Sequence, residues 1–233
     1  SGDVADPFQM LDVVGGCDTV FHLAALIGIP YSYAAPASYV QTNVLGTLNL
    51  AEAALKTGVR RFIHTSTSET YGTARYTPMD EQHPLQAQSP YAASKIAADK
   101  IVESFACSFN LPAVTVRPFN TYGPRQSARA VIPAIITQAL DSRVVRLGAL
   151  DPVRDLTYVS DTAAGFIAAA AAPVEANGQV VNLGTGAAVS IGELAELVFD
   201  ILGGEFEIVA EEARVRPEQS EVMRLISNNA QAR

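Results

Sequence analysis

The stretch Tyr91-Ala92-Ala93-Ser94-Lys95 places a phenol and an amine four residues apart. In a helix, positions i and i+4 lie one turn apart on the same face, so the Lys95 ammonium is expected near the Tyr91 phenol. A nearby positive charge favours the phenolate and should lower the pKa of Tyr91 below its usual value of about 10. Such a pair can act as general acid or base toward a substrate hydroxyl. The structural alternative is a packed tyrosine beside a solvated surface lysine, because so short a motif is weak alone.

The sequence around this stretch predicts alternating helices and strands. Ser89 and Pro90 are typical of a helix start, and this helix is expected to run to about Phe109. Four short apolar runs of the buried-strand type are found at residues 19–23, 61–66, 111–116 and 180–184. Strands that alternate with helices predict an α/β fold built on a Rossmann-type, doubly wound parallel sheet.

Small and polar side chains follow the first two predicted strands. Ala24 and Ala25 come after the first strand, and Thr67, Ser68 and Glu69 come after the second. Open α/β sheets bind ligands at the carboxyl ends of their strands, where small residues allow close approach to the backbone. Tight strand-to-loop packing and helix capping by the hydroxyls are the structural alternatives. Neither of these explains the carboxylate of Glu69.

A second helix is predicted over Pro36 to Thr57, where apolar residues recur at helical spacing. Asn43 falls inside its apolar pattern. A buried amide without partners costs roughly a few kcal/mol, so we expect the Asn43 side chain to hydrogen-bond to neighbouring backbone. Such a role can be purely structural.

The composition excludes several classes of protein. The formal net charge of −8 argues against a nucleic-acid polymer as partner, because phosphate backbones are bound by clustered Lys and Arg. No apolar run approaches the roughly 20 residues that span a bilayer, so no membrane partner is expected. Cys17 and Cys107 lack metal-ligand spacing, which predicts buried thiols in a reducing cytoplasm and no metal site.

Further groups of residues along the chain add to the Tyr91 and Lys95 pair. They are His22-Leu23-Ala24-Ala25, Asn43 with Gly46-Thr47, Thr67-Ser68-Glu69 with Tyr71-Gly72, Arg117-Pro118-Phe119-Asn120 with Tyr122-Gly123-Pro124, Arg154-Asp155 with Tyr158-Val159 and Asp161, and Asn182 with Gly184. In this order they resemble the extended short-chain dehydrogenase/reductase superfamily, in its NAD-dependent nucleotide-sugar epimerase and dehydratase branch. The resemblance extends over essentially the whole chain.

The resemblance implies roles for the candidate residues. Tyr91 would take a proton from the sugar 4-hydroxyl, to which Thr67 would also hydrogen-bond. Lys95 would hold the cofactor ribose, and Glu69 would abstract the C5 proton. The implied contacts to NAD are Asp3, Val4, Leu23, Ala24, Ala25, Asn43, Tyr91, Lys95 and Pro118. The implied contacts to a nucleotide-diphosphate sugar are Ser68, Asn120, Arg125, Arg154 and Arg216, where the guanidinium groups suit phosphate oxygens.

The implied activity is an NAD-dependent 4,6-dehydration of a nucleotide sugar to its 4-keto-6-deoxy form. A finer likeness, in residues 24–33 and 124–133, is to the dehydratases of nucleotide-activated N-acetylhexosamine in legionaminic-type pathways. Ser68 stands where the best-known sugar 4,6-dehydratases have an aspartate that protonates the leaving hydroxyl, so the general acid stays open. The alternatives are a nucleotide-sugar 4-epimerase, a UDP-glucuronate decarboxylase and a non-enzymatic NAD(P)-binding regulator.

The family's glycine-rich dinucleotide fingerprint does not occur in its expected context, since Gly15-Gly16 does not follow a strand. We therefore expect an N-terminal portion before Ser1. Residues 1–118, with the strand near 180–184, are expected to form an incomplete NAD-binding Rossmann domain. Residues 119–233 are expected to form a smaller C-terminal α/β part that binds the nucleotide sugar. The resemblance also implies a homodimer formed through the helices at 36–57 and 91–109.

Overall fold

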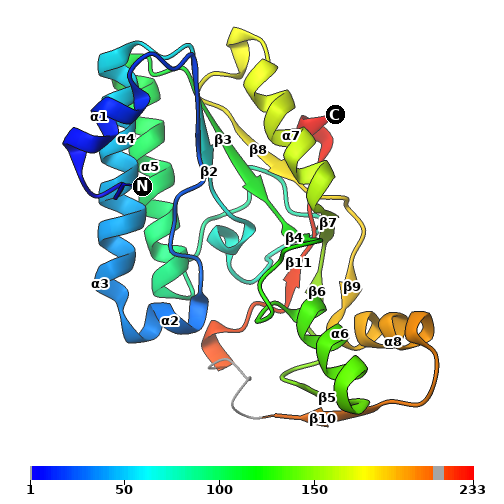
Figure 1. Cartoon of the computed structure of the whole chain (residues 1–233). Helices are drawn as coiled ribbons and strands as arrows, with labels where there is room; N and C mark the ends of the chain where they lie inside the picture. The colour runs from blue at the N-terminus through cyan, green and yellow to red at the C-terminus, as the bar shows by residue number, and fades with distance from the viewer. Residues whose placement is uncertain (1, 212–217) are drawn as a thin grey trace.

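The computed structural model describes residues 2–211 and 218–233, and its centre is a parallel sheet with helices on both faces (Figure 1). The sheet has the strand order β1-β2-β3-β8, with bounds β1 (Thr19–His22), β2 (Arg61–Thr65), β3 (Ala113–Pro118) and β8 (Val180–Leu183). Each of the three pairings is parallel. The expected doubly wound α/β fold is confirmed, and the strand near 180–184 joins the sheet beside β3.

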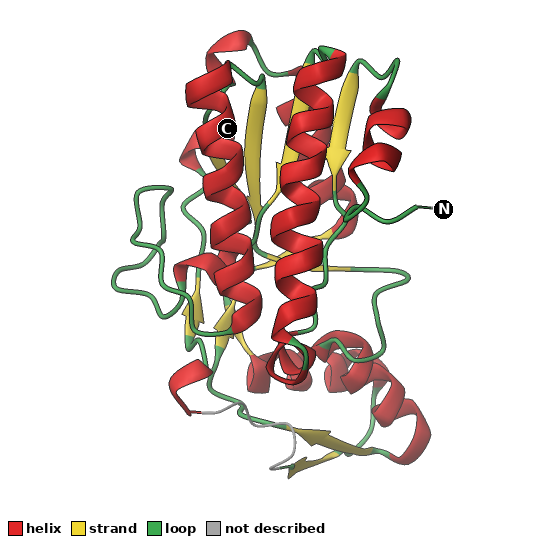
Figure 2. Ribbon diagram, turned by 90° about the vertical axis from the view of Figure 1, so that its left-hand side faces the viewer, coloured by secondary structure: helices red, strands yellow, loops and turns green. Residues whose placement is uncertain are grey.

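Helices cover the two faces of the sheet separately, as Figures 1 and 2 show. On one face lie α1 (Pro7–Val14), α4 (Gly46–Thr57) and α5 (Pro90–Phe109), and on the other lies α7 (Val159–Ala171). The strand β2 contributes to both cores, because neighbouring side chains of a strand point to opposite faces. Phe62 packs with Leu50 and Val102 on the first face, and Ile63 packs with Phe166 on the second. This explains why β2 is buried over most of its length.

The strand β1 is less buried than its apolar sequence predicts. It lies at one edge of the sheet and pairs with β2. The Phe21 side chain is 43% exposed, and Leu23, just past the strand, is 62% exposed. The expectation of a buried strand over residues 19–23 is therefore wrong for Phe21 and Leu23. Within residues 2–211 and 218–233, no segment covers these two side chains.

The predicted helix over 36–57 is present but is not a uniform α-helix. After α2 (Ile29–Ala34) come α3 (Pro36–Tyr39), a π-helical segment η1 (Val40–Leu45), and then α4. The Thr47 hydroxyl donates to the Asn43 carbonyl at 2.6 Å, so a side chain occupies an acceptor of the helical ladder at this point. Short π-helical segments of this kind are common near functional sites.

The helix α5 begins and ends as the sequence predicts. The Ser89 hydroxyl accepts a hydrogen bond from the Ala92 N–H at 3.1 Å, which caps the first turn. At the other end, Asn110 adopts a left-handed conformation with φ 55°, which terminates the helix after Phe109. The residues of the central motif therefore lie in the first two turns of a capped 20-residue helix.

Beyond β3 the chain forms smaller sheets around a second core. The strand pairs are β4 (Asn120–Tyr122) with β7 (Leu156–Tyr158), and β5 (Val144–Leu147) with β10 (Glu207–Ala210); β6 (Val153–Arg154) lies between β9 (Val189–Ser190) and β11 (Arg224–Leu225). The helices are α6 (Val131–Ser142) and α8 (Ile191–Leu202). The short 3₁₀ segments within the described residues are η2 (Ser68–Tyr71), η3 (Val174–Ala176), η5 (Glu218–Ser220) and η6 (Ala230–Ala232). Ile135, Val145 and Leu194 belong to an apolar cluster of this part.

Two further expectations concern the surface. Cys17 and Cys107 are both exposed, so the expectation of buried thiols is wrong. Cys17 follows α1 in a turn, and Cys107 lies near the end of α5, where the helix has emerged from the core. In the part of the chain that the structure describes, no helix combines the length and apolarity needed to cross a membrane.

Candidate active site

A cavity of about 420 Å³ opens at the carboxyl ends of β1, β2 and β3. The helix α5 contributes its first two turns to the same cavity. The predicted site residues that line it are Leu23, Ala25, Thr67, Ser68, Glu69, Tyr91, Lys95, Pro118 and Asn120. Segments far apart in the sequence therefore converge at one edge of the sheet, where open α/β sheets bind ligands.

The phenol of Tyr91 is buried at the cavity wall, with 7% of the residue exposed. Burial raises the pKa of Tyr91 well above its usual value, while a hydrogen bond with Thr67 lowers it and the negative charge of Glu69 raises it further. The expectation that Lys95 lowers this pKa below 10 is wrong for this structure, because desolvation is the largest effect. The same contributions place the Thr67 hydroxyl and the Glu69 carboxylate close to the phenol.

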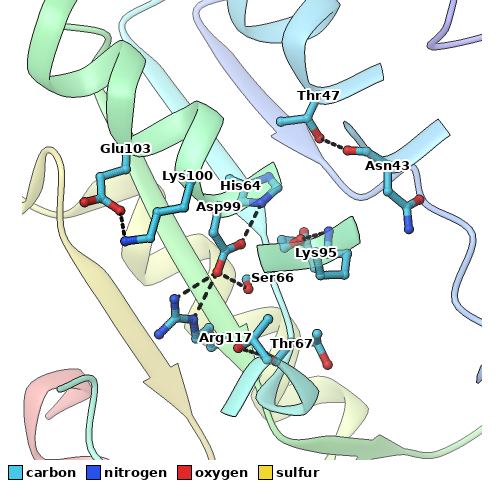
Figure 3. A network of polar contacts seen from close by, with 12 residues as sticks. Asn43, Thr47, His64, Ser66, Thr67, Lys95, Asp99, Lys100, Glu103 and Arg117 are labelled. Atoms are coloured by element: carbon cyan, nitrogen blue, oxygen red, sulfur yellow. Dashed lines mark hydrogen bonds and ion pairs between the residues drawn. The ribbon is translucent and has the colours of Figure 1, made fainter. Parts of the chain in front are cut away.

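Lys95 is also buried, with 3% of the residue exposed, and it lies one turn after Tyr91 on α5. Its ammonium donates to the Thr65 carbonyl at the end of β2, with 2.6 Å between Nζ and the oxygen (Figure 3). Burial lowers the pKa of Lys95 to about 8, and the negative charge of Asp99 opposes this shift. A cation that is held at a strand end and faces a cavity is suited to bind ligand hydroxyls or an anion.

The segment Thr67 to Glu69 starts the short helix η2. The Thr67 hydroxyl accepts from the Glu69 N–H at 3.3 Å, and the Thr70 hydroxyl donates to the Thr67 carbonyl at 2.7 Å. Ser68 is buried, whereas Glu69 is half-buried. The tight turn after β2 thus directs three successive polar side chains to one cavity.

Asn43 holds the cavity wall to the rest of the protein. Its amide oxygen accepts from the Leu26 N–H at 2.8 Å, and its amide nitrogen donates to the Leu26 carbonyl and to the Ser94 hydroxyl, both at 2.9 Å. The expected hydrogen bonding to neighbouring backbone is confirmed. Asn43 therefore positions the loop after β1 against α5, and its contact with a cofactor stays a prediction.

Besides Asn43, three of the predicted cofactor contacts do not line this cavity. Ala24 stands between Leu23 and Ala25 and is exposed without lining it. Val4 packs against α4, where a Cβ on Gly46 would come within 2.6 Å of the Val4 side chain. The Asp3 carboxylate accepts from the Ala5 N–H at 2.9 Å. Asp3 and Val4 thus flank α4, and their contact with a cofactor stays a prediction.

A second cavity of about 400 Å³ adjoins the first, since both are lined by Asn120, Thr121 and Ala130. Arg154 lines it and is 7% exposed, and its guanidinium pairs with Glu221 at 3.3 Å. The predicted Arg154 is thus placed at a ligand-sized cavity.

Arg125 does not line this second cavity. Arg125 is exposed and lines neither of these two cavities, so its prediction as a substrate contact is not supported by its position. It follows Pro124 with φ 69° and lines a neighbouring cavity that shares Thr121, Tyr122 and Gln126 with the second one. Arg216 lies outside the described residues.

Two residues of the second cavity were missed by sequence reasoning, Gln126 and Arg129. Among the described residues, the buried oxygens Asn120 Oδ1, Gln126 Oε1 and Thr65 Oγ1 have no hydrogen-bond partner. Because buried polar atoms are normally paired, these oxygens are suited to ligand donors. The turn after Pro124 was recognised as part of a motif, but its spacing does not say which side chains face the cavity.

Comparison with known proteins places the chain in a family. The family model described as GDP-mannose 4,6 dehydratase matches residues 1–232. A dTDP-glucose 4,6-dehydratase of Streptomyces antibioticus is 34% identical over 211 residues, which are 89% of this chain and 62% of the relative. A UDP-glucose 4-epimerase of Mycolicibacterium smegmatis is 35% identical over 195 residues, or 82% of this chain and 62% of the relative.

A similar solved structure is that of DesIV, a dTDP-glucose 4,6-dehydratase from Streptomyces venezuelae, with NAD and TYD bound. It has a TM-score of 0.86 and 29% identity, and the alignment covers 99% of this chain and 70% of DesIV. The chain spans 62%, 63% and 65% of the length of the first three curated relatives that it matches. The resemblance to extended short-chain nucleotide-sugar epimerases and dehydratases is confirmed, and the chain belongs to the family described as GDP-mannose 4,6 dehydratase.

Proposed function

We propose that the protein is an NAD-dependent nucleotide-sugar 4,6-dehydratase. The observation that carries this proposal is that Glu69 lines the same cavity as Thr67, Tyr91 and Lys95. The Tyr91 and Lys95 pair suits proton transfer at a hydroxyl. A carboxylate beside that pair provides a second base for the same sugar, which dehydration requires and simple oxidation does not.

The residues around the first cavity fit the nicotinamide end of NAD. Lys95 and Tyr91 would hold the ribose, while Leu23, Ala25 and Pro118 offer small and apolar walls for the ring. The buried Thr65 hydroxyl, which has no hydrogen-bond partner among the described residues, provides a polar group at the same place. When bound, NAD supplies a hydride acceptor for C4 of the sugar and then a hydride donor for C6. The solved DesIV structure, which has NAD bound, supports this assignment.

The protein's own side chains would carry the proton transfers. Tyr91 would take the proton of the sugar 4-hydroxyl, and the Thr67 hydroxyl would orient that oxygen. Once C4 is a ketone, the C5 proton is acidic, and the Glu69 carboxylate would abstract it as the C6 hydroxyl leaves. Ser68 is neutral at the position next to Glu69, so Glu69 is proposed to pass the C5 proton to the leaving hydroxyl, which departs as water. C5 would then regain a proton that comes from solvent when C6 is reduced.

The raised pKa of Tyr91 belongs to this mechanism. Since burial holds the phenol protonated, deprotonation has to be driven by the bound ligands and by the nearby Lys95 ammonium. A buried phenol with a high pKa is a strong base once ionised, so the phenolate would take the proton of the sugar 4-hydroxyl.

The second cavity is the proposed place of the nucleotide diphosphate. Arg154 and Arg129 line it, and guanidinium groups suit phosphate oxygens. Asn120 lies where the two cavities meet, so it would contact the sugar or its first phosphate. The finer substrate class, a nucleotide-activated N-acetylhexosamine, stays a prediction from the sequence.

A nucleotide-sugar 4-epimerase is the second candidate, since the similar M. smegmatis protein is a UDP-glucose 4-epimerase. An epimerase needs Thr67, Tyr91 and Lys95 but has no step for Glu69. A UDP-glucuronate decarboxylase would start from a uronic acid. The nature of the product therefore distinguishes these activities.

The test is product analysis with a Glu69→Gln variant. The full-length protein should convert one of several nucleotide sugars to a product lighter by one water, and in D₂O the product should carry deuterium at C5. Glu69→Gln should reduce the rate by about 10²–10⁴-fold, the usual contribution of a general base. Glu81→Gln is a control, because Glu81 does not line this cavity. Full dehydratase activity of Glu69→Gln would refute the assignment of the C5 base.

A homodimer and a two-part division of the chain belong to the same proposal. Apolar side chains are exposed on the helices through which dimerisation is expected: Val40, Leu45, Leu55 and Phe109. The separate apolar cluster around Ile135 supports a smaller substrate-binding part over 119–233. Both cysteines are free, which fits a cytoplasmic location. Light scattering of the purified full-length protein tests the dimer.

A further inference from the structure

A buried charged cluster lies directly behind the proposed active site, and it is centred on Asp99 (Figure 3). Asp99 lies on α5, one turn after Lys95, and is 3% exposed. Its oxygen Oδ1 accepts from His64 Nε2 at 3.1 Å, and Oδ2 accepts from the Ser66 hydroxyl at 2.7 Å. Arg117 donates to Oδ2 through Nε at 3.2 Å and through Nη2 at 2.9 Å.

These contacts join the elements that carry the proposed catalytic residues. Ser66 immediately precedes Thr67, at the end of β2. Asp99 belongs to the same helix as Tyr91 and Lys95, four residues beyond the lysine. The hydrogen bond between Ser66 and Asp99 therefore fixes the turn after β2 relative to α5. Arg117, from β3, closes the cluster on its third side.

The charges of the neighbouring side chains give Asp99 a second role in this cluster. Lys95 and Arg117 are two buried cations, and both are within electrostatic reach of Asp99. Burial lowers the pKa of His64 and of His22, so both imidazoles are neutral near pH 7. A buried charge is costly unless it is paired. Asp99 forms an ion pair with Arg117 at 2.9 Å and lies four residues after Lys95 on α5, so it is one turn from the second cation.

The other groups around Lys95 do not replace Asp99. The Thr65 carbonyl of β2 accepts a hydrogen bond from the Lys95 ammonium. The Glu69 carboxylate of η2 lines the same cavity as Lys95. His64 and His22, from β2 and β1, interact with Lys95 as like charges when protonated. Among these groups, Asp99 is the one that opposes the lowering of the Lys95 pKa by burial.

We propose that Asp99 is a positioning residue of this site: its carboxylate fixes the Thr67 to Glu69 turn against α5 and keeps the Lys95 ammonium protonated. This inference rests on the proposed function, but its electrostatic part concerns only the buried cluster and can be tested without enzyme activity. Asp99 does not line the first cavity, so it acts through Ser66 and Lys95 and does not contact the substrate.

The chain is well suited to a direct test, because its three lysines are Lys56, Lys95 and Lys100. Lys56 and Lys100 are exposed and pair with Glu52 and Glu103. In the full-length protein, NMR titration of ¹³Cε-labelled lysine follows these residues, and a Lys95→Arg variant assigns the signal of the buried one. The two exposed lysines serve as internal references in every titration.

Asp99→Asn should lower the pKa of Lys95 by about one to three units, the usual effect of a close opposite charge. Glu103→Gln is the matched control, because Glu103 lies four residues further along α5, is exposed and pairs with Lys100. It should leave the Lys95 titration unchanged. Ser66→Ala removes the hydrogen bond but keeps the Asp99 charge, so it should leave the Lys95 pKa within a few tenths of a unit and lower kcat.

Asp99→Asn leaves Arg117 buried without its partner and is at risk of not folding. The double variant Asp99→Asn with Arg117→Met removes both members of the pair, and Lys95 should still titrate at least one unit lower than in the wild type. A Lys95 pKa that moves no more in these variants than in Glu103→Gln would overturn the proposal. Because the titration needs no turnover, this failure is distinguishable from failure of the proposed function, which would leave the Lys95 shift intact.

If the proposed activity is present, the alkaline limb of the pH profile of kcat should also move. Lys95 is required in its protonated form, so in Asp99→Asn the fall in activity should begin at lower pH than in the wild type. A merely structural loss would lower the rate equally at all pH values. An unshifted alkaline limb together with a reduced rate would contradict the electrostatic role.

Discussion

Replacement of Asn43 by alanine tests whether one buried amide holds the cavity wall. Asn43 is 1% exposed and makes hydrogen bonds to the Leu26 N–H, the Leu26 carbonyl and the Ser94 hydroxyl. Leaving a buried donor or acceptor unsatisfied costs about 1–3 kcal/mol. Leu26 is half-buried, so water can partly replace the amide there. We therefore expect Asn43→Ala to lower the free energy of unfolding by about 2–4 kcal/mol.

Asn49→Ala is the matched control for this experiment. Asn49 is a buried asparagine six residues further along, and its side chain donates a hydrogen bond to the Val4 carbonyl at 3.0 Å. Its replacement should cost about 1 kcal/mol, and the gain in helix propensity is similar for the two variants. Urea denaturation followed by far-UV circular dichroism gives both values. A loss for Asn43→Ala no larger than that for Asn49→Ala would refute the inferred role.

Two further predictions concern protonation and packing. The pKa of Lys95 is about 8 in the folded chain against a usual value of 10.5, so the unfolded chain binds more protons between these pH values. The free energy of unfolding of the wild type relative to Lys95→Met should therefore be constant below about pH 8. Above that pH it should rise by up to about 1.4 kcal/mol per pH unit. A difference that stays flat from about pH 7 to 10, measured by urea denaturation, would contradict this. A Cβ on Gly184 would lie 2.4 Å from the Ser227 Cβ and 2.7 Å from Asp155 Oδ2, so Gly184→Ala should cost about 1–3 kcal/mol. Gly192→Ala, in α8 with 3.7 Å to the nearest atom, should be neutral or stabilising by up to about 1 kcal/mol, and equal thermal stabilities of the two variants would refute the packing account.

Much of the fold could be predicted because local patterns and tertiary packing agree. The strands β2, β3 and β8 are apolar because they are covered on both faces, and that is the pattern that marks them in the sequence. The capping box at Ser190 and Glu193 is likewise a local signal with a local cause. The exposed side chain of Phe21 was not predictable, because exposure depends on which element covers an edge strand.

The site could be located from the sequence, but its electrostatics could not. Tyr91, Lys95 and Glu69 were predicted, since strand ends and the first turns of a helix meet at the same edge of a parallel sheet. Arg125 adopts a positive φ, which no residue-spacing pattern specifies. The pairing of Asp99 with Arg117 joins α5 to β3 and depends on sheet register.

The pKa of Tyr91 shifts in the direction opposite to the prediction because of the groups around Tyr91 and Lys95. The i, i+4 spacing correctly brings Lys95 one turn from Tyr91, but the ammonium donates to the Thr65 carbonyl and has Asp99 as its counter-charge. The positive charge near the phenol is therefore largely compensated within the protein, and desolvation controls the phenol. A site built in this way keeps the proton on Tyr91 until a bound ligand changes the local charge. The same burial that makes the phenol a poor acid at rest makes its anion a strong base in the closed cavity, so the carboxylate of Asp99 sets how much of the Lys95 charge is left to stabilise that anion.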